Sequence, residues 1–587
     1  MAEQLMPTMN LPGEYFTTDI ARHIWDTKYR YRAGNVIYDN SIEDTWRRIA
    51  RALARIEPKD QARWEQQFYH ALEGFKFLPG GRIQAGAGTD HRVTLFNCFV
   101  MGLIEDSMDR IFDHLKQGAL TMQQGGGIGY DFSTLRPRGT PARTTGTIAS
   151  GPVSFMRIWD SMCATLLSTG ARRGAMMATL RCDHPDIEEF VAAKRDSHEL
   201  RHFNLSVQIT DEFMEAVRQD DEWALVFPAE ELGDDTADRK TVLRHWPGSD
   251  SPTPCRVLRL IRAQSLWDQI MRATYDYAEP GVSFVDRVNR SNNLWYREHI
   301  TATNPCGEIP LPPYGACNLG SVNLTCFVRN PFTVDAYLDM NGLRETTAIA
   351  TRILDNVIDV SQFPLSEQAE QARNSRRLGL GITGLGDALV MLGLHYAEQT
   401  ARELATNIMQ TICYTAYRTS VSLADEKNPF GWFDRENYLD GEFVRTLPED
   451  IRDGIAKHGI RNSHLTAIAP AGTISLLANN ISSGVEPIYS LSHSRRILET
   501  DGSYKICELR DYAYRMWQEK GDEQAQLPRQ FVDAKNLSPI AHLDMQAALQ
   551  PYVDNAISKT INVPEDYAFE EFRNLYQLAY EKGLKGC

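Results

Sequence analysis

The chain alternates between two kinds of apolar segment over most of its 587 residues. Short apolar runs of strand length, such as TLFNCFVMGLI at 94–104, are followed by longer segments with helical spacing, such as SMDRIFDHLKQGALTMQ at 107–123. Strands that alternate with helices typically form parallel sheets. The sequence therefore predicts an α/β fold, although periodicity alone does not distinguish a barrel from an open sheet.

The first part of the chain precedes this alternation. Two segments, 41–57 (SIEDTWRRIARALARIE) and 61–75 (QARWEQQFYHALEGF), carry apolar residues along one face of a helix. We therefore expect an N-terminal helical region over residues 1–90 and a larger α/β domain over residues 91–587. The polar, proline-containing stretch at about 229–255 predicts a surface insertion within that domain, because apolar periodicity resumes after it.

Charge and hydropathy narrow the classes of partner. Asp and Glu number 77 against 62 Lys and Arg, a formal net charge of −15, so we expect no nucleic-acid partner. No stretch approaches the roughly 18 apolar residues of a membrane span, and the N-terminus does not resemble a secretory signal. The sequence thus predicts a cytoplasmic protein without membrane association. Small anionic ligands stay compatible with it, because local arginine clusters can bind them despite the net charge.

The ten cysteines are too sparse for a secreted disulfide scaffold, and none forms a C-x-x-C pair. The chain therefore offers neither a zinc ribbon nor a thioredoxin-like motif, and we expect no metal-binding residues. Four cysteines are expected to be ordinary core residues, namely Cys163, Cys326, Cys413 and Cys507.

Gly379, Gly381 and Gly384 spell the G-x-G-x-x-G pattern of dinucleotide-binding loops. That function needs an apolar strand directly before the glycines, whereas the preceding EQAEQARNSRR is polar and helical in character. We therefore expect a closely packed turn here.

The segment most informative about chemistry is TATNPCGEIPLPPYGACNLGSVNL, residues 301–324. Its prolines and glycines exclude a continuous helix and disfavour a regular central strand, which leaves a stiff loop. If this loop is extended, the side chains of Asn304, Cys306 and Glu308 project together. A thiol beside an amide and a carboxylate offers an abstraction centre, a hydrogen-bonding group and a general base. Cys317 could return beside them on a neighbouring strand.

This segment resembles the active-site finger loop of the ribonucleotide reductases. The resemblance continues, in the expected order, in five other motifs, which are FNCFV around Cys98, GGGIGYDFSTLRPRG, LSTGARRGAMMATL, EPGVSFVDRVNRSN and APAGTISLLANNISSGVEPIYS. It extends from about residue 65 to the C-terminus. It implies a ten-stranded α/β barrel with a central finger loop, preceded by the helical region.

The resemblance also implies a role for each residue of the loop. Cys306 would become a thiyl radical that abstracts the 3′ hydrogen of the substrate ribose. Glu308 would take the 3′-hydroxyl proton, and Asn304 would hydrogen-bond the sugar. Cys98 and Cys317 would supply two electrons and finish as a disulfide, which needs their Cα atoms to lie within about 7 Å of each other.

Two nucleotide sites are implied in the same way. The first would hold the substrate phosphates at a helix N-terminus, with residues Ala471, Gly472, Thr473, Ile474 and Ser475. The second would bind deoxynucleoside triphosphate or ATP effectors, with residues Asp106, Ser107, Arg136, Arg172 and Arg173. Solvated loop positions are the alternative interpretation of these arginines. The effector helices imply a homodimer.

Three features favour the adenosylcobalamin-dependent class within this family. They are the lack of a recognisable regulatory ATP-cone domain at the amino end, the sequence motif QQGGGIGYDFSTLRPRG, and the C-terminal motif AYEKGLKGC. The implied activity is reduction of ribonucleoside diphosphates to deoxyribonucleotides for DNA synthesis. Two alternatives stay open. One is the large subunit of a class that takes its radical from a metal-bearing partner, and the other is a non-catalytic nucleotide-binding half of a split reductase.

The sequence departs from the cobalamin-dependent pattern at two places. Such relatives usually continue into a tail whose paired cysteines re-reduce the active-site disulfide, whereas this sequence reaches Cys587 without such a pair. We therefore expect either a thioredoxin-like reductant or a separate polypeptide that carries the C-terminal redox cysteines. The second departure is Gly80-Gly81-Arg82, where relatives often have Asn, Ser or Thr near the substrate phosphates; Arg82 could compensate.

Overall fold

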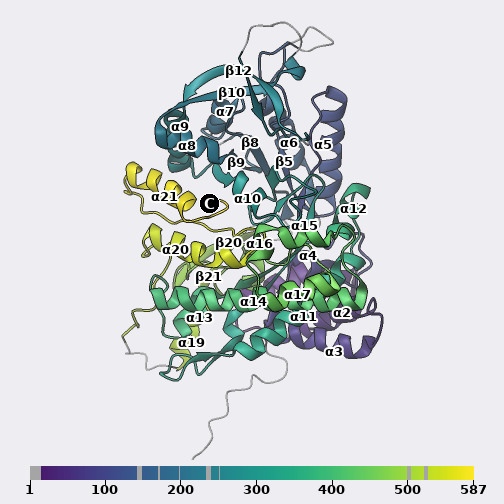
Figure 1. Ribbon diagram of the computed structural model, residues 1–587. Coiled ribbons are helices and arrows are strands. Elements are labelled where there is room, and N and C mark those ends of the chain that lie inside the picture. The colour runs from purple at the N-terminus through teal and green to yellow at the C-terminus, as the bar shows by residue number, and fades with distance from the viewer. Residues whose placement is uncertain are drawn as a thin grey trace, which may run out of the picture.

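The chain begins with a helical region that packs on one side of a large curled sheet (Figure 1). The computed structural model describes residues 15–141, 148–168, 172–196, 198–232, 240–249, 251–498, 504–520 and 526–587. The helical region contains α1 (Asp19–Ile24), the π-helical turn η1 (Trp25–Tyr29), α2 (Ile42–Ala54), α3 (Gln61–Leu72) and α4 (Gly81–Gly86). The two helices expected from amphipathic spacing are thus confirmed as α2 and α3. Within the described ranges, no helix is long and apolar enough to cross a membrane.

The central sheet has eight strands, in the order β13–β9–β8–β5–β4–β16–β19, with β3 pairing beside β16. Their bounds are Gly281–Phe284, Phe203–Ile209, Met176–Arg181, Gly127–Asp131, Cys98–Val100, Ala316–Asn323, Leu378–Thr383 and, for β3, Phe77–Pro79. The strands from β13 to β4 are parallel, and so are β16 and β19, but β4 and β16 run antiparallel. The sheet therefore consists of two halves of opposite direction that meet where β4 pairs with β16.

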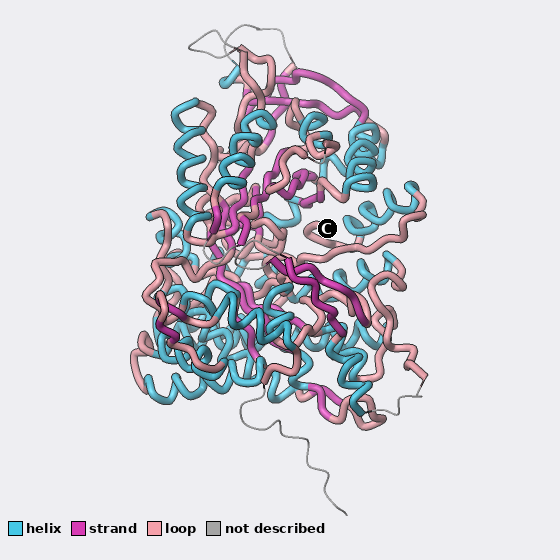
Figure 2. The backbone as a smooth tube through the Cα atoms, turned by 180° about the vertical axis from the view of Figure 1, so that it is seen from behind, coloured by secondary structure: helices cyan, strands magenta, loops and turns pink. Residues whose placement is uncertain are grey.

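Contacts from the end of the chain close this sheet into a barrel. Beyond β19, parallel bridges join Leu380 to Thr466 and Ile468 to Ile557. At the opposite edge, the backbone N–H of Phe284 in β13 donates to the Lys585 carbonyl at 3.0 Å. The ammonium group of Lys585 donates in turn to the carbonyls of residues 554 and 555, at 2.6 and 2.5 Å. The predicted α/β barrel is confirmed, and Figure 2 shows its strands running through the middle of the molecule.

Helices cover the outside of both halves. On the second half, α11 (Met340–Val360) packs against β16 and β19, and α14 (Gln399–Lys427) packs on α11. On the first half, the predicted helix at 107–123 is present as α5 (Met108–Gln123), and α6 (Pro152–Thr165) lies beside it.

A buried ion pair fastens the helical region to the barrel. The guanidinium of Arg352 on α11 donates to both carboxylate oxygens of Glu57, at 2.8 and 2.6 Å, and the Asn356 amide donates to Glu57 at 2.6 Å. Two parallel bonds of this kind fix orientation as well as distance. The helical region is therefore held in a defined position beside the sheet.

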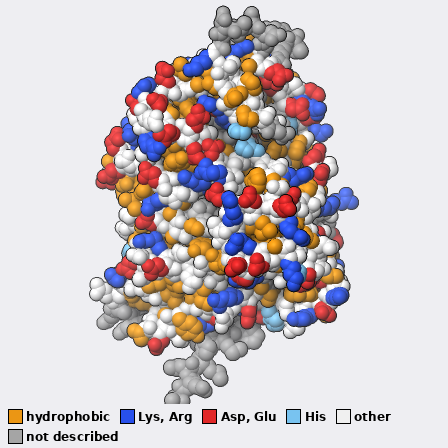
Figure 3. Space-filling view, in the orientation of Figure 1, with side chains coloured by type: hydrophobic (Ala, Val, Ile, Leu, Met, Phe, Trp, Pro, Cys, Tyr) orange, Lys and Arg blue, Asp and Glu red, His pale blue; other side chains and the backbone are white. Residues whose placement is uncertain are grey.

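The polar stretch at 229–255 contributes to a small antiparallel sheet at one end of the molecule (Figure 1). In that sheet β12 (Thr253–Arg262) pairs with both β10 (Glu222–Pro228) and β11 (Thr241–Arg244). On the face shown in Figure 3, acidic and basic side chains intermix over the surface. The described residues of this stretch therefore include β11 and the start of β12.

The cysteines expected in the core divide into two groups. Cys163 on α6 and Cys413 on α14 are buried, as predicted, whereas Cys326 and Cys507 are partly exposed. Cys507 lies in the two-stranded hairpin of β20 (Ser492–Leu498) and β21 (Tyr504–Arg510), which has little sheet to cover it.

The G-x-G-x-x-G glycines serve close packing of the barrel. The prediction of a turn is right for Gly384, which has φ +76° and precedes α13 (Leu385–Met391), but wrong for Gly379 and Gly381, which lie in β19. A Cβ on Gly381 would lie 2.2 Å from the backbone oxygen of Ala467. These glycines allow β19 and the segment after it to approach each other.

This contact predicts the effect of one methyl group. Replacing Gly381 by Ala is expected to lower the free energy of unfolding by about 1–3 kcal/mol, because the rigid backbone of Ala467 must shift. Urea unfolding measures the difference. Gly281→Ala in β13 is the matched control, because the nearest atom to its added Cβ lies at 3.4 Å. Equal stability of the two variants would contradict the packing explanation.

Candidate active site

The finger loop enters the barrel as a short hairpin of β14 (Ala302–Thr303) and β15 (Pro310–Leu311). It lies against the inner face of the first half, because a Cβ on Gly129 in β5 would stand only 1.9 Å from the Thr303 carbonyl. The carbonyl of Thr301 accepts hydrogen bonds from Thr179 Oγ1 at 3.0 Å and Gln208 Nε2 at 2.6 Å. Contacts with strands β5, β8 and β9 therefore fix the position of the loop inside the barrel.

The tip of the loop is a turn and not the extended segment expected from its sequence. The backbone N–H of Gly307 donates to the Asn304 carbonyl at 3.1 Å, and Gly307 has φ +84°. The N–H of Ile309 donates to Asn304 Oδ1 at 3.0 Å. The condition of an extended segment is therefore not met, because the turn directs Asn304 and Glu308 inward and leaves Cys306 exposed, although all three residues line one cavity.

The two inward side chains meet Cys98 on β4. Asn304 Nδ2 donates to Cys98 Sγ at 3.2 Å, and the Cys98 thiol donates to Glu308 Oε1 at 3.9 Å. All three residues are 4 % exposed or less. The backbone of Glu308 is fixed too, since its carbonyl accepts from the Ala556 N–H at 2.9 Å. The structure thus brings together three of the five residues expected to act on the ribose, and exposed Cys306 lines the same cavity.

The fifth residue, Cys317 on β16, lies opposite Cys98 across the junction of the two half-sheets. The two residues are register partners in the antiparallel ladder, where opposite Cα atoms are about 4.5–5.5 Å apart. Both are free thiols here, and Cys317 donates to the Asn318 carbonyl at 3.3 Å. The backbone distance expected for a disulfide is met, and each thiol has to leave its present acceptor, Glu308 for Cys98 and the Asn318 carbonyl for Cys317.

Burial controls the protonation of these groups. It raises the pKa of Glu308 to about 7, against hydrogen bonds from Asn304 and Cys98 that lower it. Glu308 Oε2 has no hydrogen-bond partner among the described residues. Burial, aided by the nearby Glu308 charge, raises the pKa of Cys98 well above its usual value, and burial also raises the pKa of Cys317. The site therefore holds neutral thiols beside a carboxyl group poised near neutral pH.

A cavity of about 800 Å³ opens over the finger tip. It is lined by Cys98, Asn304, Cys306 and Glu308, and by residues 469–474 across from them. Three features of the wall carried no clear signal in the sequence. They are Asn97, whose Oδ1 has no partner among the described residues, the glycine run at 125–127, and the segment 28–32 of the helical region. Asn97 adjoins Cys98 in FNCFV, and the glycine run begins the motif GGGIGYDFSTLRPRG, but the segment 28–32 belongs to no motif of this chemistry.

Four of the five residues expected to bind substrate phosphates line this cavity. Gly472 and Thr473 are exposed to it at the start of α18 (Gly472–Leu477), and a Cβ on Gly472 would meet nothing within 4 Å. The first N–H groups of a helix have no intrahelical acceptor. Ser475 is placed differently, since it is buried with its hydroxyl 3.2 Å from Thr383 Oγ1.

The residues expected at the effector site are not brought into one cluster. Asp106 forms an ion pair with Arg136, and the Ser107 hydroxyl caps α5 by accepting the Arg110 N–H at 3.4 Å. Arg172 and Arg173 form β7, which pairs with β6 (Leu167–Ser168); their side chains lie outside the described residues. The next residue, Gly174, lies against Met122 at the other end of α5, a helix about 24 Å long.

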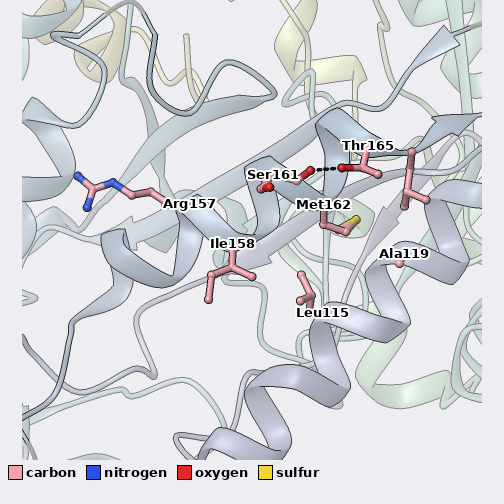
Figure 4. A pocket seen from close by; sticks show the side chains of 8 residues that line it. Leu115, Ala119, Arg157, Ile158, Ser161, Met162 and Thr165 are labelled. Carbon is pink, nitrogen blue, oxygen red and sulfur yellow. Dashed lines mark hydrogen bonds between the residues drawn. The ribbon is translucent and has the colours of Figure 1, made fainter.

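A second pocket, of about 540 Å³, lies between α5 and α6. Apolar side chains of both helices gather there, including Leu115, Ile158 and Met162 (Figure 4). Two further side chains of α5, Met108 and Phe112, are 60 % and 44 % exposed. The outer face of this helix pair is therefore apolar enough to associate with another protein surface.

The burial of Glu308 predicts a pH-dependent cost to stability. Its pKa is about 7 in the folded chain and near 4.5 in the unfolded chain, so the unfolded chain loses this proton first as the pH rises. Stability falls between these two values and then levels off. Glu308→Gln is therefore expected to match the wild type near pH 4 and to exceed it by about 3 kcal/mol at pH 8.

Urea unfolding over this pH range measures the difference between the two proteins. Glu345→Gln on α11 is the control, because that side chain is exposed, and it should match the wild type throughout. A constant difference between Glu308→Gln and wild type at every pH would contradict a titration of the buried carboxyl group.

Comparisons with known proteins agree with this geometry. A family model described as ribonucleotide reductase, barrel domain, matches residues 96–587, and one described as ribonucleotide reductase, all-alpha domain, matches residues 15–92. A vitamin B12-dependent ribonucleoside-diphosphate reductase of Mycobacterium tuberculosis (strain CDC 1551 / Oshkosh) is 36 % identical over 559 residues, which cover 92 % of this chain and 73 % of that protein.

Two further relatives match most of this chain at lower identity. A protein of the same name from Thermoplasma acidophilum is 34 % identical over 89 % of this chain and 64 % of its own length. The ribonucleoside-diphosphate reductase large subunit of Caenorhabditis elegans is 31 % identical over 70 % of this chain and 54 % of its own length. The chain therefore belongs to the ribonucleotide reductase family, as its motifs predict, and it is similar to the vitamin B12-dependent members of that family.

Proposed function

We propose that this chain is an adenosylcobalamin-dependent ribonucleoside-diphosphate reductase, which replaces the 2′-hydroxyl of its substrate by hydrogen through a thiyl radical. Its product would supply DNA synthesis. One observation carries the proposal: an exposed thiol, Cys306, lines the same cavity as buried Cys98, Asn304 and Glu308. The names of the similar bacterial and archaeal enzymes support the cofactor and the diphosphate substrate.

In the first half of the reaction, the Cys306 radical takes the hydrogen atom from the 3′ carbon of the ribose. Glu308 accepts the 3′-hydroxyl proton, a task suited to a carboxyl group whose pKa is about 7. Asn304 accepts the Ile309 N–H through Oδ1, and its Nδ2 donates to Cys98 Sγ. From this position its amide group also hydrogen-bonds the sugar. With a radical at the 3′ carbon, the 2′-hydroxyl leaves as water after it gains a proton.

In the second half, Cys98 and Cys317 provide two electrons and become a disulfide. The balance is one ribonucleotide and two thiols converted to one deoxyribonucleotide, one disulfide and one water. At the end Cys306 returns the hydrogen atom to the 3′ carbon of the ribose and is again a thiyl radical. The raised pKa of Cys98 supports this role, because a neutral thiol carries the proton that the leaving hydroxyl needs.

The residues at the finger tip fit a large cofactor outside the loop. Cys306 is exposed, whereas Cys98 and Cys317 are buried, and a Cβ on the adjacent Gly307 would meet nothing within 4 Å. Cys306 and Gly307 are thus the residues we expect to face the cofactor. When bound, adenosylcobalamin supplies the one-electron chemistry that removes the hydrogen atom from the Cys306 thiol.

The remaining parts of the proposal concern partners. The substrate phosphates lie at Gly472 and Thr473, with Ala471 and Ile474 beside them in the cavity wall. Asp106, Ser107 and Arg136 contribute to the effector site, and the apolar α5–α6 face forms the homodimer contact. A thioredoxin-like protein or a separate redox polypeptide reduces the disulfide. The cytoplasmic location expected from the sequence stays a prediction.

The test is anaerobic reduction of CDP by the reduced chain with adenosylcobalamin and a small dithiol. The wild type is expected to form dCDP, and Cys306→Ser to form none, because an alcohol does not replace the thiol as a radical carrier. Cys507→Ser is the matched control, because that cysteine lies on the β20–β21 hairpin, and it should retain full activity.

Each other outcome has a definite meaning. Turnover by Cys306→Ser would overturn the assigned radical site. No turnover by the wild type with cobalamin, but turnover after addition of a metal-bearing radical subunit, would replace this proposal by the large-subunit alternative. Nucleotide binding without turnover under both conditions would favour the non-catalytic alternative.

The Glu308 assignment also predicts how the rate depends on pH. The turnover rate kcat is expected to rise as the pH increases through about 7, because Glu308 accepts a proton only when it is ionised. Stopped assays of dCDP formation at saturating CDP measure this profile. A rate that is independent of pH from about 6 to about 8 would show that another group accepts the proton.

A further inference from the structure

The wall of the active-site cavity is cationic in an acidic chain. Its lining includes four basic side chains, which are Lys28, Arg30, Arg32 and Arg82. Glu308 is the single carboxylate among the lining residues of the described chain, and it lies at the bottom near the finger tip. The whole chain has a net charge of −15. The basic charge is thus concentrated where an anionic ligand enters.

These basic residues come from the N-terminal helical region, which the structure places directly beside α18. Helix α1 packs against α18, and η1 packs against α4, which carries Arg82. Hydrogen bonds also join the residues before α1 to Asn479, which lies two residues after α18. The Thr17 N–H donates to Asn479 Oδ1 at 2.8 Å, and Asn479 Nδ2 donates to the Tyr15 carbonyl at 2.9 Å. The helical region and the segment 471–479 therefore form one continuous wall of the cavity.

Local backbone geometry brings Lys28 and Arg82 to this wall. Lys28 lies in the π-helical turn η1, an uncommon structure that occurs often at functional sites. The next residue, Tyr29, has its hydroxyl 3.2 Å from the position of a Cβ on Gly81, so η1 and the start of α4 are in close contact. Arg30 and Arg32 both pair with Asp26, which already balances much of their charge.

Arg82 extends into the cavity itself. A Cβ on Gly125 would lie 2.4 Å from the central carbon of its guanidinium group, and Gly125 has φ +99°. Gly125 begins the glycine run that lines the cavity beside the finger loop. The absence of a side chain at this position therefore leaves the guanidinium group its place against the cavity floor.

We propose that Lys28 and Arg82 form a binding site for the terminal phosphate of the ribonucleotide substrate, adjacent to Gly472 and Thr473. The helical region then takes part directly in substrate binding. Arginine binds phosphate through two parallel N–H···O bonds, and lysine adds a compact positive charge. This inference rests on the proposed function, because it concerns the substrate of that reaction.

The test compares binding of CDP, cytidine and dATP to the reduced, cofactor-free chain by calorimetry, together with KM and kcat for CDP reduction. Arg82→Met and Lys28→Met are each expected to weaken CDP binding and raise its KM roughly tenfold or more, with little change in kcat. Binding of cytidine, which has no phosphate, and of dATP, which probes the effector site, should not change. Arg82→Lys should recover part of the loss.

Arg92→Met is the matched control, because Arg92 is exposed on the same region and does not line the cavity. It should bind CDP as the wild type does. Thermal unfolding of each variant separates a loss of binding from a loss of folding.

If the wild type reduces CDP but both Arg82→Met and Lys28→Met bind CDP with unchanged affinity, the phosphate site alone is overturned. Weaker dATP binding with unchanged CDP binding would assign these residues to the effector and overturn the proposal. A wild type that neither binds nor reduces CDP would overturn the proposed function and this inference together.

Discussion

The antiparallel pairing of β4 with β16 joins the two halves of the barrel and sets the chemistry of its interior. Because Cys98 and Cys317 are register partners in this ladder, two thiols 219 positions apart in sequence stand side by side without help from any loop. A shift of the register by one residue would turn one thiol to the opposite face. The pairing of these two thiols, which we propose to be redox-active, is thus a property of the sheet.

The finger loop adds Cys306, the proposed radical site, to this pair, and the position of the loop depends on how closely two backbone segments approach each other. Gly129 allows the Thr303 carbonyl to pass against β5, and the turn at Gly307 separates exposed Cys306 from buried Glu308. The arrangement has a cost, since Glu308 is buried with an oxygen that no described residue satisfies. We interpret this unfavourable burial as the reason that Glu308, the proposed base, ionises near neutral pH.

Much of the fold and of the catalytic set could be predicted from the sequence, because the signals were local. The amphipathic spacing at 107–123 gave α5, and the NPCGE motif named Asn304, Cys306 and Glu308 before any geometry was known. Their conformation was not predictable, because alternation in an extended chain and a tight turn both bring these side chains near one sulfur.

Long-range placement was the other limit. Gly379 and Gly381 were expected in a turn, because the residues before them are polar and helical in character, but they lie in β19, where they allow close contact with the segment at Ala467. Likewise, nothing local in the segment 28–32 connects it with residue 472, because only the packing of α1 on α18 brings them to one cavity. The Arg82 substitution could be noticed in the sequence, but its place beside Gly125 depends on the folded structure.

The most direct test of this account is the fate of the cysteines after a single turnover. The reduced chain, given adenosylcobalamin and CDP but no external reductant, would be alkylated and its peptides mapped by mass spectrometry without reduction. The account predicts about one dCDP per chain, a disulfide that links the Cys98 and Cys317 peptides, and a Cys306 thiol that still reacts with the alkylating agent. Formation of dCDP with Cys98 and Cys317 both alkylated, or with a disulfide to any other cysteine, would contradict it.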